Sequence, residues 1–241
     1  MTSTERAMHA RSVVVTGVGR SGQIGETVAH AFALTGAVVS IVARRLADAE
    51  ERAADLAAAG SRVHPFACDL TDHSACTVLA RDVLRVAGRV DVLVNIAGGF
   101  AFSGPVADSD PAVLASQYAV NVATAYCATR AFLPALRESS GVVIFTTSAT
   151  ALPGARVRGM SAYVMAKMAV IGLMQAVAQE GHSHGVRANA IAPGPVRTST
   201  NLASMPGDTR YVERDAVASA IMFLASADAD AITGQVVELS P

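Results

Sequence analysis

The sequence of 241 residues contains no tryptophan, only three cysteines (Cys68, Cys76 and Cys127), and 16% charged residues. The cysteines form no CxxC pair and no spacing typical of zinc ligands, which argues against a disulfide framework or a metal site. We expect three reduced, buried thiols. A net charge of −1 argues against a globally basic nucleic-acid binder, and 51% hydrophobic residues exclude a disordered chain.

Long hydrophobic runs are also missing. The longest apolar stretches are about six residues, as in 169–174, whereas a membrane-spanning helix needs about 20. Residues 1–11 contain Glu5 and Arg6 and lack the apolar segment of a secretory signal. We therefore expect a cytoplasmic protein without membrane or nucleic-acid partners. Because no repeat or linker divides the chain, residues 1–11 are expected to be a flexible lead-in and 12–241 a single domain.

Short β-branched segments alternate with helix-forming segments along the chain. We expect strands at 12–16, 37–43, 62–67, 91–95, 141–147, 186–191 and 235–239, and helices at 25–35, 46–59, 72–87, 110–137, 161–183 and 214–225. This alternation predicts an α/β protein with a single-domain Rossmann fold, in which helices cover both faces of a seven-stranded parallel sheet. The long connections 99–109, 149–160 and 194–213 all follow strands, so they emerge at the carboxyl edge, where such sheets bind ligands.

A glycine-rich turn joins the first strand to the first helix, and it reads Thr16-Gly17-Val18-Gly19-Arg20-Ser21-Gly22-Gln23-Ile24-Gly25. Glycines let the backbone approach a pyrophosphate at a helix N-terminus, so the turn predicts a dinucleotide site. At the end of the second strand, an acidic residue would favour NAD(H), but the chain has Arg44 and Arg45 there. With Arg20 in the turn, this charge favours NADP(H), and NAD(H) stays open.

Tyr163 and Lys167 are four residues apart near the start of an expected helix, so their side chains share one face. An ammonium group and a cationic nicotinamide nearby would lower the tyrosine pKa from about 10. The phenol would then exchange a proton with a carbinol oxygen. Ser148 ends the fifth strand at the same sheet edge, where its hydroxyl can bond a substrate oxygen.

Together these motifs resemble the short-chain dehydrogenase/reductase family, in particular its 3-oxoacyl reductases, along nearly the whole chain. The matching pieces are Thr16-Gly17…Gly25, Cys68-Asp69-Leu70, Asn95-Ile96-Ala97-Gly98, Asn121, Ser148, Tyr163-Val164-Met165-Ala166-Lys167, Pro193-Gly194-Pro195-Val196 with Thr198, Phe223-Leu224-Ala225-Ser226 and Ile232-Thr233-Gly234-Gln235.

The resemblance implies a role for each piece. Tyr163 is implied as general acid/base, Lys167 as ligand of the nicotinamide ribose, Ser148 as the group that orients the carbonyl, and Asn121 as holder of a proton-relay water. The implied cofactor-binding residues are Gly17, Gly19, Arg20, Ser21, Gln23, Ile24, Arg44, Arg45, Asp69, Leu70, Asn95, Ala97, Gly98, Tyr163, Lys167, Pro193, Gly194, Val196 and Thr198. No metal is implied. The helices over 110–137 and 161–183 are expected to pack in a homodimer or homotetramer.

Three features depart from the family pattern. Gly17 and Gly25 are eight residues apart, farther than usual, and this turn is similar to that of enoyl-acyl-carrier-protein reductases. Ser148 is also farther than usual from Tyr163, which leaves Thr150 as an alternative. The segment 195–213, interpreted as a short substrate lid, is shorter than in many relatives.

The sequence therefore predicts an NADP(H)-dependent oxidoreductase that interconverts a small-molecule ketone or aldehyde and the corresponding alcohol. Thioester-linked substrates are included in this prediction. One alternative is an enoyl-thioester reductase that reduces a C=C bond, as the long turn indicates. Another is a cofactor-binding protein without turnover. Phe100 and Phe102 are candidates for an apolar wall of the substrate pocket.

Overall fold

The computed structural model describes residues 11–57 and 61–241. Apart from Arg11, the expected lead-in lies outside the described residues, as does the end of the expected helix 46–59. Seven strands form one sheet in the order β3-β2-β1-β4-β5-β6-β7. Their bounds are β1 Ser12–Thr16, β2 Val38–Ala43, β3 Arg62–Ala67, β4 Val92–Asn95, β5 Val142–Thr146, β6 Arg187–Pro193 and β7 Val236–Leu239.

Every neighbouring pair of strands is parallel, which confirms the expected sheet. The order reverses between β1 and β4, and this switch point is where open α/β sheets bind their ligands. The longer helices are α2 Ile24–Leu34, α3 Leu46–Ala57, α4 His73–Ala87, α5 Pro111–Tyr118, α6 Thr124–Ser139, α7 Ser161–Gly181 and α9 Arg214–Ala225, and a short α8 spans Ser199–Ser204.

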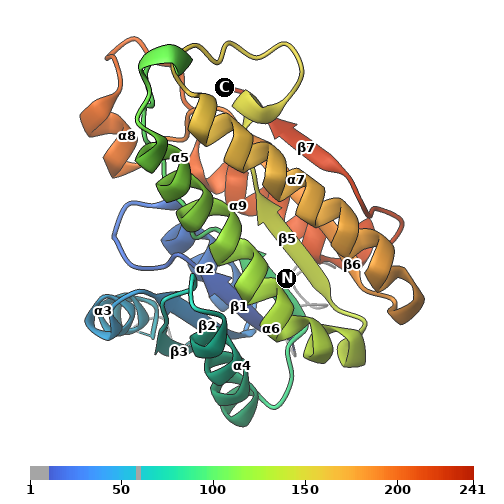
Figure 1. The fold of residues 1–241 in the computed structure, drawn as a ribbon. Coiled ribbons are helices and arrows are strands. Elements are labelled where there is room, and N and C mark those ends of the chain that lie inside the picture. Colours follow the sequence, from blue (N-terminus) through green and yellow to red (C-terminus); the bar gives the residue numbers. More distant parts are fainter. Residues whose placement is uncertain (1–10, 58–60) are drawn as a thin grey trace.

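Helices cover both faces of the sheet (Figure 1). One apolar cluster joins α4, α6 and α7 to the sheet, and the other joins α2, α3 and α9 to the opposite face. Successive residues of β1 alternate between them, because Val14 belongs to the first cluster and Val13 and Val15 to the second. The apolar β-branched strands are therefore explained by burial on both sides.

Local signals fixed several helix ends. Asp72 caps α4 by accepting hydrogen bonds from the backbone N–H groups of Ser74 and Ala75, and Gly88 ends the helix with a left-handed φ of 76°. The expected helix 110–137 is interrupted, since a π-helical turn over Ala119–Ala123 separates α5 from α6. The helix α8 and several 3₁₀ turns were not expected from the sequence.

By length and composition, Ser161–His184 is the one stretch of the described residues that is apolar enough to cross a membrane. In this fold the stretch contains α7, whose side chains Val170 and Met174 are buried in the core cluster against the sheet. The core position of α7 accounts for part of its apolar composition, since 39% of the apolar 18-residue segment within this stretch is buried.

Candidate active site

The Tyr163–Lys167 pair lies on the first turns of α7, at the carboxyl edge of the sheet. Lys167 Nζ is 5.8 Å from the centre of the Tyr163 ring, so the expected shared face is present. The lysine is 5% exposed, and its ammonium donates to the Thr146 carbonyl at the end of β5, at 3.0 Å. Thr147 Oγ1 donates to the Lys167 carbonyl at 2.8 Å and thereby ties α7 to the strand end.

Burial changes the pKa of both members of the pair. It lowers the pKa of Lys167 to about 8, because removal from water disfavours the ammonium. It raises the pKa of Tyr163 above its ordinary value, and a hydrogen bond with Ser148 partly offsets this rise. The phenol is therefore protonated at neutral pH in the protein alone. The Phe100 ring stands edge-on to the Tyr163 ring, with centroids 5.1 Å apart.

Ser148 and Thr150 compete for the role of the carbonyl-orienting hydroxyl. Their two hydroxyl oxygens lie 2.9 Å apart, so one bonds the other. Ser148 also forms the hydrogen bond that lowers the pKa of the Tyr163 phenol, whereas Thr150 contributes no such hydrogen bond. Ser148 is buried, two residues after the end of β5, in an extended conformation that caps the short 3₁₀ turn 149–151. This geometry favours Ser148.

Asn121 lies in the π-helical turn between α5 and α6. Its amide nitrogen donates to the carbonyls of Gly99 and Gln117, and its amide oxygen accepts from the Gly99 N–H at 3.1 Å. The side chain therefore fixes the loop that follows β4. The wide π turn is a local departure from regular helix of a kind that occurs at functional sites.

Gly17 of the glycine-rich turn fits against the loop after β4 with no room for a side chain. A Cβ on Gly17 would lie 2.8 Å from the Ala97 nitrogen, and Gly17 has a left-handed φ of 79°. A Cβ on Gly98 would lie 2.6 Å from Asn121 Oδ1 and 3.4 Å from Lys167 Nζ. Thr16 Oγ1 accepts from the N–H groups of Ile96 and Ala97, which joins the ends of β1 and β4.

Glu26 holds the same turn from its helix side, and sequence reasoning missed it. Its carboxylate accepts from the Gly22 N–H at 2.6 Å and from the Ser21 hydroxyl at 3.1 Å. Arg52, a buried arginine of α3, pairs with Glu26 at 3.1 Å and also with Glu51 and Asp55. Burial alone would raise the pKa of Glu26, but these hydrogen bonds hold it below its ordinary value. The sequence did offer a signal for this contact, because a glutamate at the third position of a helix often accepts a hydrogen bond from the backbone just before the helix.

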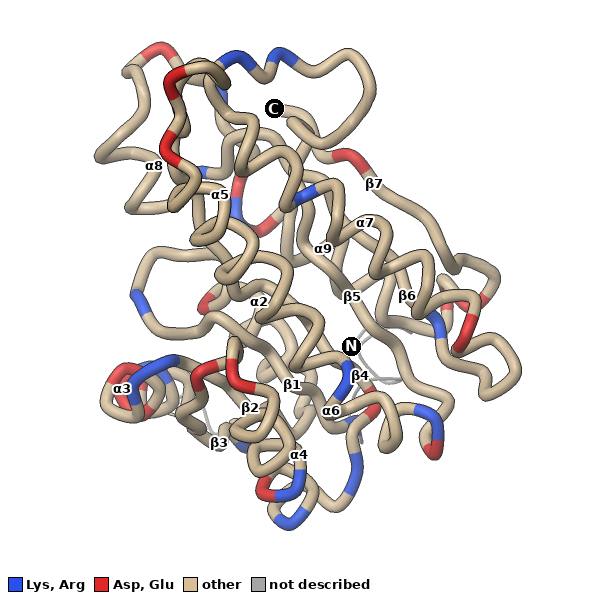
Figure 2. Tube along the Cα trace, viewed as in Figure 1, with Lys and Arg blue, Asp and Glu red and all other residues tan. Residues whose placement is uncertain are grey.

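The arginines that we expect near a 2′-phosphate interact with two different carboxylates, Asp48 and Asp69. Arg45 forms a two-point ion pair with Asp48, with Nε 2.9 Å from Oδ2, and this bond lowers the pKa of Asp48. Arg20 acts on Asp48 electrostatically, whereas Arg44 acts on Asp69. Figure 2 shows basic and acidic residues side by side around α3. Asp48 was missed, although its spacing of three from Arg45 is typical of helical ion pairs.

The side chains of several implied cofactor ligands have partners within the protein. Asp69 Oδ1 accepts from the N–H and the hydroxyl of Thr71, which leaves Oδ2 for a ligand. Asn95 donates to Thr129 of α6 at 2.9 Å, and its buried Oδ1 has no partner among the described residues. Leu70 is part of the core.

The remaining implied ligands are Pro193, the last residue of β6, and Gly194, Val196 and Thr198, which follow it. Thr198 caps α8 by accepting from the Asn201 N–H at 3.1 Å. Val196 is buried and forms a bridge with Val212, and the Gly194 N–H donates to the Leu239 carbonyl. The segment 193–198 is thus fixed to β7 and to residue 212, close to the edge that carries Tyr163.

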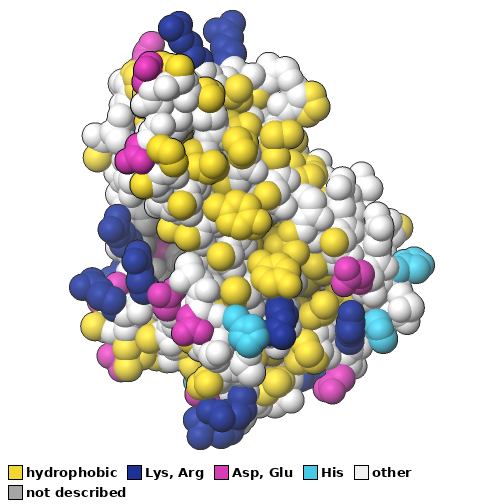
Figure 3. All heavy atoms as spheres, viewed as in Figure 1, with side chains coloured by type: hydrophobic (Ala, Val, Ile, Leu, Met, Phe, Trp, Pro, Cys, Tyr) yellow, Lys and Arg dark blue, Asp and Glu magenta, His cyan; other side chains and the backbone are white. Residues whose placement is uncertain are grey.

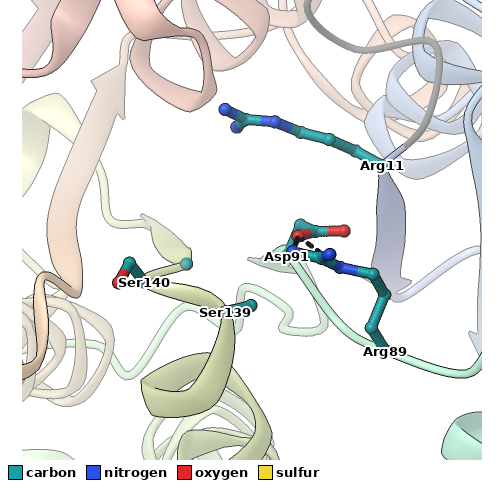
Figure 4. A pocket seen from close by; sticks show the side chains of 6 residues that line it. Arg11, Arg89, Asp91, Ser139 and Ser140 are labelled. Atoms are coloured by element: carbon teal, nitrogen blue, oxygen red, sulfur yellow. Dashed lines mark hydrogen bonds and ion pairs between the residues drawn. The ribbon is translucent and has the colours of Figure 1, made fainter.

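The described residues contain no group of three or more His, Cys, Asp or Glu side chains that could hold a metal ion. The three cysteines are free and buried, as expected. A polar hollow of about 210 Å³ lies at the opposite, amino edge of the sheet, where Arg11, Asp91 and Gly141 precede β1, β4 and β5 (Figure 4). The salt bridge between Arg89 and Asp91 lies in its wall. This hollow is remote from the carboxyl edge of the sheet, where Tyr163 lies.

A nicotinamide dinucleotide fits the residues at the carboxyl edge. The glycine turn leads into a helix start and has open space beside its backbone. A Cβ on Gly19 would find only contacts of 3.6 Å or longer, so a diphosphate can approach there. Lys167 has one hydrogen-bond acceptor, Thr146, among the described residues, and an ammonium carries three N–H donors. The free donors suit the hydroxyls of a ribose.

Known proteins agree with this geometry. A family model described as short chain dehydrogenase matches residues 11–207. Galactitol 2-dehydrogenase (L-tagatose-forming) of Cereibacter sphaeroides is 34% identical over 236 residues, which cover 92% of this chain and 90% of that enzyme. Meso-2,3-butanediol dehydrogenase of Serratia marcescens is 32% identical over 235 residues, with the same coverage of both chains.

A solved structure is similar along the whole chain. It is a 7α-hydroxysteroid dehydrogenase complexed with NADH and 7-oxo glycochenodeoxycholic acid, with a TM-score of 0.90, 25% identity, and coverage of 99% of this chain and 96% of that one. The match of the family model to most of the chain, the parallel sheet and these relatives lead to one conclusion. The chain belongs to the short-chain dehydrogenase/reductase family and is an oxidoreductase of that family.

Proposed function

We propose that this protein interconverts a ketone or aldehyde and an alcohol, with Tyr163 as general acid/base. The observation that carries the proposal is that the Tyr163 phenol lies beside both the Ser148 hydroxyl and the Lys167 ammonium. Ser148 bonds the Tyr163 hydroxyl, and the buried ammonium of Lys167 lies beside the ring. The relatives named for galactitol and butanediol act on secondary alcohols, which supports carbonyl chemistry over C=C reduction.

The side chains divide the reaction between them. A bound nicotinamide dinucleotide supplies or accepts the hydride. Tyr163 gives its proton to the substrate oxygen during reduction and takes it back during oxidation. Ser148 donates a hydrogen bond to that oxygen and positions it beside the phenol. Lys167 stabilises the phenolate that forms when the proton leaves, because its ammonium lies beside the ring. Asn121 keeps the loop after β4 in place.

For the cofactor we propose NADP(H) over NAD(H). The support is charge: no acid follows β2 directly, and Arg44 stands at its tip, exposed and free of ion pairs among the described residues. Arg20 adds positive charge from the glycine turn. Asp48 opposes this preference, because it already holds Arg45. A 2′-phosphate would therefore bind Arg44 and Arg20 first.

We also propose that the chain acts as a homodimer or homotetramer, built on the outer face of α5, α6 and α7. Exposed apolar side chains on these helices are Leu114, Tyr118, Tyr126, Met165 and Met168, each at least 40% exposed. Figure 3 shows hydrophobic side chains gathered over this face. A patch of this kind marks an interaction surface.

A substrate panel with NADPH and NADH tests the reaction. We expect oxidation of NADPH with simple ketones or with an acetoacetyl thioester, and none with a crotonyl thioester. Turnover of the crotonyl thioester alone would support the enoyl-reductase alternative. Tight NADPH binding without turnover of any carbonyl would support a cofactor-binding protein.

Replacement of the tyrosine tests the mechanism. Tyr163→Phe removes the proton donor but keeps the ring that packs against Phe100. Its kcat should fall at least about 100-fold, the lower end of what general acid–base catalysis contributes. NADPH affinity, measured by fluorescence, should stay within about twofold. Full turnover in this variant would refute the role of Tyr163.

A further inference from the structure

The lengthened glycine turn and the shortened segment 195–213 are in direct contact. Gln23 Nε2 donates to Ser199 Oγ at 2.7 Å and to Thr200 Oγ1 at 3.0 Å. The Ser199 N–H donates to the Gly22 carbonyl at 3.0 Å, and the Ser199 hydroxyl donates to the Ser21 carbonyl at 3.1 Å. Gln23 and Ser199 are 176 residues apart, so this is tertiary contact between the two segments with unusual length.

The contact is close and is supported from behind. A Cβ on Gly22 would lie 2.7 Å from Ser199 Oγ, and Gly22 has a left-handed φ of 71°. Both the close contact and the backbone conformation therefore disfavour a side chain at this position. On its other side, the turn is held by Glu26, which accepts from the Gly22 N–H and pairs with Arg52. The turn is therefore a fixed platform against which the start of α8 rests.

The helix α8 has little else to hold it. None of its six residues, all of which the structure describes, is buried, and Leu202 is 53% exposed. Its other hydrogen bonds, such as the one from Asn201 Nδ2 to the Val196 carbonyl at 2.8 Å, run within 195–213 itself. Because each exposed hydrogen bond contributes only about 1 kcal/mol net, the part of the segment between the buried Val196 and Val212 can separate from the turn at modest cost.

Resting on the proposed function, we propose that Gln23 is a positioning residue that latches the lid, segment 195–213, to the phosphate-binding turn. Binding of the cofactor diphosphate at the turn and closure of the lid over the substrate are then one linked equilibrium. The Gln23 carboxamide serves the lid, and the backbone of the turn serves the diphosphate. Linkage is reciprocal, so a closed lid raises cofactor affinity by the same factor by which the cofactor favours closure.

The first experiment needs no cofactor. Arg210 is an exposed trypsin site inside the lid, and cleavage after it reports release of the segment. Thr200→Val should raise the cleavage rate about fivefold, the factor for one lost hydrogen bond, and Gln23→Ala, which loses two, should raise it at least as much. The double variant should be no faster than Gln23→Ala alone, because the bond that Thr200→Val removes is already lost when Gln23 is replaced.

Ser204→Ala is the matched control. The Ser204 hydroxyl bonds the Thr200 carbonyl within α8, at 2.9 Å, and does not contact the turn. This variant should be cleaved at the wild-type rate. Circular dichroism melting curves identify any variant whose cleavage reflects global unfolding. Wild-type cleavage rates in Gln23→Ala and Thr200→Val would overturn the latch.

The second experiment adds NADP⁺. In the wild type, saturating NADP⁺ should slow cleavage at Arg210 at least about fivefold, the lower end of typical coupling. In Gln23→Ala, this protection should fall below about twofold, and the NADP⁺ dissociation constant should rise. Full protection in Gln23→Ala, or none in the wild type despite binding, would overturn the linkage. Absence of any NADP⁺ or NADPH binding to the wild type would instead refute the proposed cofactor, and the cofactor-free experiment would still decide the latch.

Discussion

The Lys167 ammonium lies 5.8 Å from the centre of the Tyr163 ring and donates to the Thr146 carbonyl at 3.0 Å. No carboxylate among the described residues pairs with it, so burial lowers its pKa to about 8. The positive charge beside the phenol therefore costs folding free energy at neutral pH. The site trades stability for a cation held near the reacting oxygen.

This cost predicts a pH dependence. The unfolded chain keeps the Lys167 proton up to about pH 10.4, whereas the folded protein keeps it only up to about pH 8. Between these values the unfolded state binds more protons, so this group makes stability rise with pH. From pH 7 to pH 10, the wild type should gain about 2 kcal/mol of unfolding free energy relative to Lys167→Met. Urea titrations of both proteins measure the difference, and parallel pH curves would contradict it.

Ser148 and Thr150 make separate predictions because only Ser148 bonds the phenol directly. Ser148→Ala should lower kcat about 100-fold, as expected for a donor to the reacting oxygen. Thr150→Val should lower kcat only a few-fold, because it removes a partner of Ser148. NADPH affinity should change little in either variant. The reverse order of the two kcat values would assign the role to Thr150.

Asp48 predicts a change in cofactor preference. Its carboxylate holds Arg45 and lies near the place expected for a 2′-phosphate, with Oδ2 3.9 Å from a Cβ built on Gly19. Asp48→Asn frees the guanidinium and removes a like charge, so the NADPH dissociation constant should fall several-fold while that of NADH changes little. The control is Glu50→Gln, an exposed acid of the same helix. Equal effects on both cofactors would rule out this role for Asp48.

The outer face of α5–α7 predicts an oligomer. Met168→Glu places a charge in the exposed apolar patch and should shift the protein to a monomer in light-scattering chromatography. Leu34→Glu, on α2 in the opposite helix layer, replaces a leucine that is even more exposed and should leave the mass unchanged. A monomeric wild type would exclude an interface on this face.

Most of the fold could be predicted because its signals are local. Runs such as Val13-Val14-Val15 indicate doubly buried strands, and Asp72 and Gly88 mark helix ends through their own backbone partners. The π turn at Asn121 and the helix α8 could not be predicted. The first depends on contacts with Gly99, and the second rests on Gly22 and Gln23, far away in the sequence.

The candidate site divides in the same way. Tyr163 and Lys167 share a face because their spacing dictates it, and the carboxyl edge follows from parallel strands. The ion pair between Arg45 and Asp48 and the bond from Gly22 to Glu26 depend on side-chain choices among several possible partners. Composition counts these charges but does not assign their partners.

Lys167 is also the single lysine in the sequence, and it is 5% exposed. All other cationic side chains are arginines or histidines. Reagents that acylate amines therefore find no freely accessible lysine side chain on this protein. Any lysine acylation detected by mass spectrometry would report transient opening of the first turns of α7, which makes this residue a built-in probe of local fluctuations.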